Sequence, residues 1–156
     1  MIEALIFEGG GVKGSAYAGV TEVLESNGVL ANVKRVAGAS AGAITASLIA
    51  TGAGNKGLHK SVIQTNFHDF ITDRGGVFLE AGRFLRQFGL HSGEAFVDIL
   101  RTQIAENCGN ADITFQQLAE LSSGEHSEAK ELYVVASNLS RLRAQVFSHY
   151  NTPNLE

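Results

Sequence analysis

The stretch LIFEGGGVKGSAYAGV, residues 5–20, joins a short apolar run to a glycine-rich turn and then to a helical pattern. Residues 4–7 are apolar and stop at the glycines, which is typical of a buried strand. From Ser15 to Asn27 apolar residues recur at helical spacing, and Gly28 follows as a stop. The apolar residues that fall on one face of this helix are Ala16, Val20, Val23 and Leu24. The stretch therefore predicts a strand, a tight turn and a helix.

A second strand, turn and helix follow directly. Val33 to Ala39 contains a β-branched run, residues 38–42 form a small-residue turn, and Ala41 to Thr51 is alanine-rich and carries no charge. An uncharged helix of this kind is expected to lie at the centre of the fold, buried on all sides. Two successive strand-to-helix units predict an α/β fold with a mainly parallel sheet.

The second half of the chain continues with helices and then strands. We expect a helix over residues 94–106 behind the N-cap Ser92, and a short helix behind a capping box that starts at Thr114. Residues 132–136 give the strongest strand pattern, and residues 144–149 predict a second strand after a connection over residues 138–143.

Composition limits the class of protein. The chain has 156 residues, 44% hydrophobic and 18% charged, which fits one globular domain. The net charge of -4 argues against nucleic acid as the main partner. The single cysteine, Cys108, excludes an internal disulfide and agrees with a reducing compartment. No metal-binding pattern occurs, so we expect neither a metal nor a cofactor.

The sequence also lacks membrane-targeting patterns. The N-terminus has neither a basic region nor a long apolar run, so no signal peptide is expected. No apolar segment reaches the roughly 18 residues needed to span a bilayer. We therefore expect a cytoplasmic protein or one bound peripherally to a membrane.

The first glycine turn matches two nucleotide-binding patterns only in part. Gly9, Gly11 and Gly14 satisfy G-x-G-x-x-G, but the strand expected over residues 33–39 contains no acidic residue to hold a ribose. A phosphate-binding P-loop needs lysine directly after its last glycine, whereas Lys13 lies inside the loop. A dinucleotide-binding domain is thus a distant third interpretation.

The second turn has the G-x-S-x-G pattern of a nucleophile elbow, with Ser40 between Gly38 and Gly42. A serine on such a turn projects its oxygen above the sheet, and acyl transfer then needs backbone N–H groups to hold the developing oxyanion. The neighbouring glycine loop can supply them through Gly10 and Gly11, with Ala41 as a further donor. The alternative from the pentapeptide alone is that Ser40 only caps its helix.

Together the two turns resemble the patatin-like phospholipase family. The motif GGGVKG at residues 9–14 is followed by GASAG at residues 38–42, and weaker similarities continue through residues 89–93, 114–118 and 132–139. The resemblance implies a three-layer α/β/α fold, lipid acyl hydrolysis and a Ser-Asp dyad. It implies that Ser40 is the nucleophile, flanked by Gly38 and Gly42. The oxyanion-hole residues it implies are Gly9, Gly10, Gly11, Lys13, Gly14 and Ala41.

The family's aspartate lies in an Asp-Gly motif toward the C-terminus, and this chain has no such motif. Its only aspartates are Asp69, Asp73, Asp98 and Asp112, and none precedes a glycine. Either residues 1–156 form a single domain truncated before that motif, incomplete at the C-terminus, or the protein is a shortened relative without the usual base. We favour truncation.

The leading interpretation is a phospholipase A-like serine acyl hydrolase acting on phospholipids or related lipid esters. The rival is a non-catalytic lipid-binding or interaction module that retains the fold without the base. Five phenylalanines between residues 67 and 88 fit either an acyl-binding wall or ordinary core packing. None of the five histidines lies in a recognisable catalytic motif.

Overall fold

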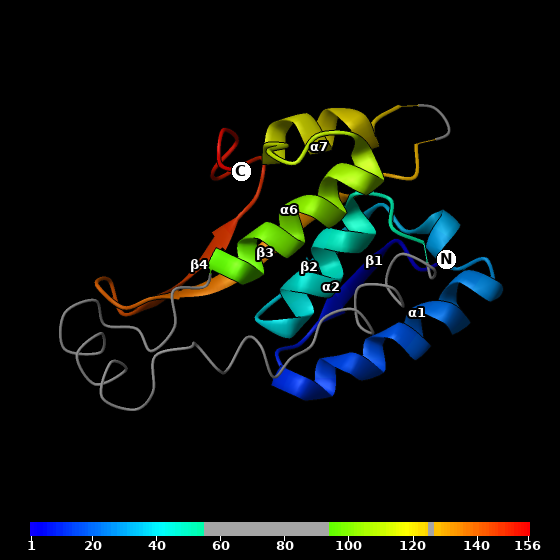
Figure 1. The fold of residues 1–156 in the computed structure, drawn as a ribbon, viewed down its shortest axis with the longest axis horizontal. Coiled ribbons are helices and arrows are strands. Elements are labelled where there is room, and N and C mark those ends of the chain that lie inside the picture. The colour runs from blue at the N-terminus through cyan, green and yellow to red at the C-terminus, as the bar shows by residue number, and fades with distance from the viewer. Residues whose placement is uncertain (55–93, 125–126) are drawn as a thin grey trace.

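The computed structural model describes residues 1–54, 94–124 and 127–156, which build one sheet and the helices packed on it (Figure 1). The strand order is β1-β2-β3-β4; β1, β2 and β3 are parallel and β4 is antiparallel to β3. The strands span Ala4–Phe7 (β1), Arg35–Gly38 (β2), Glu131–Asn138 (β3) and Arg143–Phe147 (β4). The expected α/β class with a mainly parallel sheet is confirmed.

The helices lie close to where the sequence predicts them. They span Ala16–Ser26 (α1), Ala41–Ala50 (α2), Glu94–Cys108 (α6) and Phe115–Ser122 (α7), with short 3-10 turns at Gly11–Ser15 (η1) and Leu30–Asn32 (η2). The predicted capping box is present, since Gln117 N–H donates to Thr114 Oγ1 at 3.2 Å and Thr114 N–H donates to Gln117 Oε1 at 3.0 Å. The phenylalanine-rich segment 67–88 lies outside the described residues.

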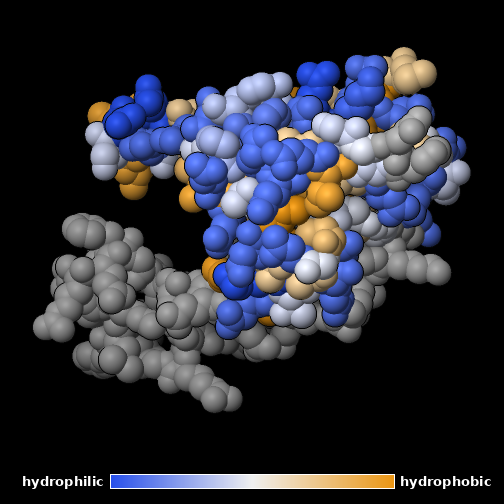
Figure 2. All heavy atoms as spheres, turned by 90° about the horizontal axis from the view of Figure 1, so that it is seen from above, coloured by the Kyte–Doolittle hydropathy of each residue, from blue (hydrophilic) through white to orange (hydrophobic). Residues whose placement is uncertain are grey.

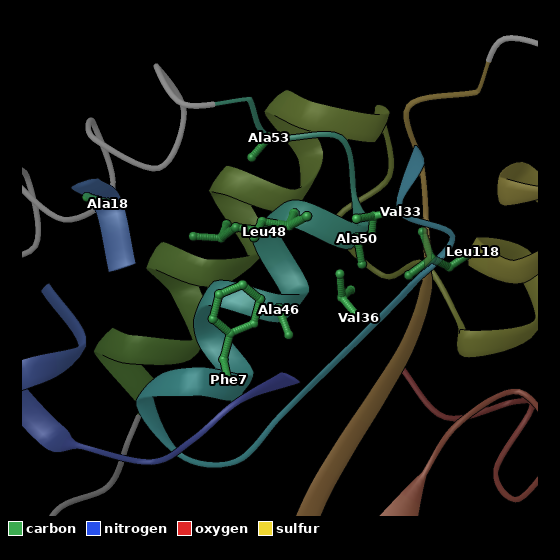
Figure 3. Close-up of a cluster of buried hydrophobic side chains, with 10 residues drawn as sticks. Phe7, Ala18, Val33, Val36, Ala46, Leu48, Ala50, Ala53 and Leu118 are labelled. Atoms are coloured by element: carbon green, nitrogen blue, oxygen red, sulfur yellow. The ribbon is translucent and has the colours of Figure 1, made fainter. Parts of the chain in front are cut away.

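Helix α2 is the centre of the core, as its uncharged sequence predicts. Ala46 and Leu48 pack between the sheet and the neighbouring helices (Figure 3), and Ile49 belongs to the same buried cluster. The hydroxyls of Ser47 in α2 and of its C-cap Thr51 are hydrogen-bonded within the helix, because each donates to the backbone carbonyl four residues earlier. Such internal bonds remove the cost of burying a hydroxyl, so α2 can be enclosed.

Helix α1 is confirmed, and the residues that it buries are not those of its apolar face. Val20 is exposed and Val23 is 60% exposed, whereas Ala18 and Thr21 are buried. The Tyr17 hydroxyl donates to the Glu8 carbonyl at 2.9 Å and ties α1 to the residue that follows β1. Ala18, next to Tyr17, belongs to the core. Thr21 can be buried one turn after Tyr17 because its hydroxyl donates to the Tyr17 carbonyl at 2.7 Å.

All four described α-helices contribute to the core on one face of the sheet. Phe7 and Val36 point into that core and are almost fully buried. On the opposite face Ile6 is 82% exposed, and Val135 and Val146 are also exposed. Two of the three layers that the family resemblance implies are therefore visible in the part of the chain that the structure describes.

Candidate active site

The two glycine turns meet at the carboxyl end of the sheet. Phe7 of β1 and Gly38 of β2 are register partners in a parallel pair, so the turns that follow them start side by side. A methyl group on Gly9 would lie 3.1 Å from Ser40 Cβ, and one on Gly14 would lie 2.7 Å from Ala41 Cβ. The first loop thus packs directly against the second: a methyl group on Gly14 would force a shift, and one on Gly9 would fit only if its neighbour gave way by a few tenths of an ångström.

Ser40 has a backbone conformation that L-residues rarely adopt, with φ 51° and ψ -127°. Such a conformation costs on the order of 1–3 kcal/mol and is found mainly at functional sites. Its side chain makes no capping hydrogen bond to α2, and the residue is exposed. The interpretation of Ser40 as a simple helix cap is therefore wrong.

The glycines on either side of Ser40 make this turn sterically feasible. A methyl group on Gly38 would overlap the Gly42 carbonyl, and one on Gly42 would overlap the Phe7 carbonyl at the end of β1. The first turn of α2 consequently rests on the backbone of β1. Larger residues at either position would move the serine away from the glycine loop.

Three backbone N–H groups at this edge donate to no turn, loop or cap acceptor among the described residues. Lys13 N–H donates to the Gly10 carbonyl at 3.1 Å and holds the loop in its 3-10 turn, while Gly11 takes a positive φ of 53°. Among the turn, loop and cap hydrogen bonds of the described residues, none uses the N–H of Gly10, Gly11 or Ala41 as donor. N–H groups at helix starts are able to bind anionic oxygen, and these three lie at the edge of the sheet that carries Ser40.

Tyr17 supports the loop, and the sequence analysis did not single it out. Besides its bond to the Glu8 carbonyl, its ring meets Phe7 edge-on with centroids 5.1 Å apart. These contacts hold Phe7 and Glu8, the two residues that directly precede the glycine loop. An aromatic residue three positions after Gly14 was the only sequence clue to this role.

Neither described aspartate stands out as a base for Ser40. Asp112 forms a two-point ion pair with Arg101, with Nη1–Oδ1 at 2.5 Å and Nη2–Oδ2 at 2.7 Å. The end of α6 adjoins the end of α2, because Asn107 donates to Thr51 Oγ1 at 3.1 Å. Since α2 is about 15 Å long, Asp112, just beyond α6, lies far from Ser40. Asp98 lines a shallow hollow on the outer side of α6, and Asp69 and Asp73 lie outside the described residues.

His149 is the one histidine within the described ranges, and it belongs to an aromatic cluster. Its ring stacks on Tyr150 at 3.8 Å and meets Tyr133 edge-on at 6.3 Å. Burial, and then a hydrogen bond to Glu131 Oε2 at 2.9 Å, raise the pKa of Tyr133 to about 12. The cluster lies beside the first half of β3, away from the edge that carries Ser40.

The described residues contain neither a candidate membrane span nor a candidate metal site. Over residues 1–54, 94–124 and 127–156, no helix combines the length and apolarity needed to cross a membrane. In the same ranges no three histidine, cysteine, aspartate or glutamate side chains gather closely enough to hold a metal ion.

Comparison with known proteins gives a family match over nearly the whole chain. The model of the patatin-like phospholipase family matches residues 5–154. The uncharacterised protein YqhO of Bacillus subtilis strain 168 is 46% identical over 69 residues, covering 44% of this chain and 23% of that protein. The uncharacterised protein R571 of Acanthamoeba polyphaga mimivirus is 24% identical over 155 residues, covering 99% of this chain and 48% of that protein.

A solved structure shares the fold. In the heterodimeric complex ExoU-SpcU from the type III secretion system of Pseudomonas aeruginosa, the matched chain aligns with a TM-score of 0.78 at 24% identity. The match covers 99% of the present chain and 34% of the matched one. The chain thus spans about half or less of the length of the proteins it matches.

Proposed function

The chain belongs to the patatin-like phospholipase family, and from this premise we propose that it is the nucleophile-bearing part of a lipid acyl hydrolase. The substrate class is a phospholipid or related lipid ester. The observation that carries the proposal is the Ser40 turn, in which a strained backbone presents an exposed serine beside the N–H groups of Gly10, Gly11 and Ala41.

In the proposed reaction Ser40 Oγ attacks the ester carbonyl carbon while its proton passes to a general base. The carbonyl oxygen becomes an oxyanion and accepts hydrogen bonds from the N–H groups of Gly10, Gly11 and Ala41. The C–O bond to the leaving alcohol then breaks as the base returns the proton to it. Water hydrolyses the resulting acyl-enzyme by the same steps in reverse order. Each oxyanion donor is expected to contribute roughly 3 to 4 kcal/mol.

Lys13 is proposed to act through charge and not as a ligand of the oxyanion. Its side chain is exposed on the glycine loop, where a cation raises the local potential for an anionic lipid headgroup. The backbone of the loop does the positioning, since Lys13 N–H closes the turn on the Gly10 carbonyl.

We propose that the general base is an aspartate outside residues 1–156. The arrangement of Asp98 and Asp112 supports this, because one faces the outer hollow of α6 and the other is held by Arg101. Two further facts support a larger domain: the matched proteins are two to four times longer than the aligned part, and one face of the sheet exposes Ile6.

The test is covalent labelling of the full-length natural protein with a fluorophosphonate probe, with phospholipid hydrolysis measured in parallel. Ser40→Ala should abolish labelling and lower hydrolysis by about 10⁴-fold or more. The matched control is Ser26→Ala, since Ser26 is an exposed serine at the end of α1 and its removal should change neither signal.

The possible results separate the two functions. Labelling that persists in Ser40→Ala would refute the assignment of the nucleophile. A folded full-length protein that neither labels nor hydrolyses lipid would instead support the non-catalytic lipid-binding module.

A further inference from the structure

We propose that the tip of the β3–β4 hairpin, residues 139–142, is a docking element for anionic phospholipid bilayers. This inference rests on the proposed function, because it supplies the means by which the Ser40 edge would reach a lipid surface. The four tip residues are Leu139, Ser140, Arg141 and Leu142.

The hairpin tip projects from the same edge of the sheet as Ser40. Val134 of β3 is level with Gly38 of β2, and β3 continues in the same direction for four more residues to Asn138. At about 3.3 Å per residue, the tip stands about 13 Å or more beyond the end of β2. Figure 1 shows the hairpin extending past the starts of α1 and α2.

Two leucines at the tip are almost fully exposed to water. Leu139 is 82% exposed and Leu142 is 90% exposed. Turn residues in hairpins are ordinarily glycine, asparagine, aspartate or serine, which need no burial. In Figure 2 hydrophobic and strongly hydrophilic atoms lie side by side at the projecting end where Figure 1 places this tip.

Leu142 is held in place at a conformational cost. Its φ is 47°, a left-handed conformation that costs a residue with a Cβ about 1–2 kcal/mol and that glycine or asparagine would adopt more easily. Asn138 braces the turn, because its Oδ1 accepts from Arg141 N–H at 3.0 Å and its Nδ2 donates to Gln145 Oε1 at 3.0 Å. A bulky apolar side chain in a strained and braced position is a feature that clusters at functional sites, which supports a role for the Leu142 side chain in docking.

The charge at the tip fits an anionic bilayer. Arg141 and Arg143 are exposed, and within the described residues neither is within 4.0 Å of a carboxylate. Residues 132–155 contain these two arginines and no acidic residue, although the whole chain carries a net charge of -4. On a lipid surface the leucines would reach the boundary of the acyl chains, and the neighbouring arginines would meet the phosphate groups of the lipid heads.

The glycine loop adds a second exposed pair at the same edge. Val12 is 62% exposed, and Lys13 follows it with an exposed side chain. Val12 and Lys13, one apolar and one basic residue, thus lie on the β1 side of Ser40. The leucines and arginines of the hairpin lie on its β3 side. A bilayer contacted at both points would face the Ser40 turn.

The experiment measures binding of the full-length protein to vesicles by co-sedimentation, in the Ser40→Ala background so that no lipid is consumed. The probes are vesicles of phosphatidylcholine alone and of phosphatidylcholine mixed with phosphatidylglycerol. Leu142→Asn should weaken binding to the anionic vesicles about tenfold and raise the thermal midpoint, because asparagine relieves the strained turn. Replacing Arg141 and Arg143 by glutamine should weaken anionic binding about 25-fold, about fivefold for each charge, with little effect on neutral vesicles.

A matched control distinguishes docking from general loss of apolar surface. Val23→Ser removes a 60% exposed apolar side chain from α1, away from the hairpin tip, and should leave binding unchanged. Binding that survives Leu142→Asn, or that Val23→Ser weakens as much, would overturn the proposal. Fluorophosphonate labelling without hairpin-dependent binding would refute the docking element alone. Hairpin-dependent binding without labelling would refute the catalytic proposal and leave the docking element standing.

Discussion

Replacing Gly42 by alanine should destabilise the protein, although the change adds a better helix former to α2. The new methyl group would overlap the Phe7 carbonyl and lie 2.6 Å from the Glu8 carbonyl oxygen. Both are main-chain atoms at the end of β1, so no side-chain rotation can relieve the overlap. The first turn of α2 has to move off the strand.

The expected size follows from two opposing terms. Overpacking against a fixed backbone costs about 3 kcal/mol, and alanine in place of glycine in a helix returns about 1 kcal/mol. The net loss is therefore about 2 kcal/mol. Gly19 in α1 provides the matched control, because a methyl group there meets nothing within 4 Å; Gly19→Ala should gain about 1 kcal/mol.

The assay is urea unfolding followed by circular dichroism, with Ser40 labelling as a second readout. A difference of about 3 kcal/mol between the two variants corresponds to about 1.5 M urea between their midpoints. Gly42→Ala should also lose labelling, since α2 carries Ser40 at its start. Equal midpoints for the two variants would refute the close contact between α2 and β1.

Two further predictions concern the second half of the chain. Thr114→Ala should lower the free energy of unfolding by about 1 kcal/mol through loss of the capping box, whereas Thr114→Ser should retain it; equal losses in a urea titration would contradict this. In a spectrophotometric titration one phenol should ionise near pH 12, and Tyr133→Phe should remove that step. Because folding raises this pKa from 10.0, the stabilisation from neutral Tyr133 is present below about pH 10 and is lost as the pH rises toward 12. A titration with no phenol ionising near pH 12 would contradict the burial of Tyr133 together with its hydrogen bond to Glu131.

Local sequence was sufficient to predict the elements and the position of the candidate site. Apolar periodicity and glycine stops depend on neighbouring residues, so the strands at β1, β2 and β3 and the central helix α2 were predicted within a few residues. The two glycine motifs placed Ser40 and Gly9 on turns after parallel strands. Parallel neighbours then bring those turns to one edge, as the sequence predicted.

Tertiary contacts decided which side chains are buried and how the serine is presented. Val20 and Val23 share an apolar face of α1, yet Ala18 and Thr21 are the residues that α1 buries. Which face is buried depends on the strands and helices that pack against α1, and local periodicity does not record those contacts.

The sequence by itself determined the fold class, the family resemblance and the two turns, because each depends on residues close together in the chain. Only the tertiary structure showed that Ser40 does not cap its helix and that a methyl group on Gly42 would meet β1. It also revealed the exposed leucines at the hairpin tip. Exposure and steric fit depend on what lies across space from a residue, and that is set by how the strands and helices pack.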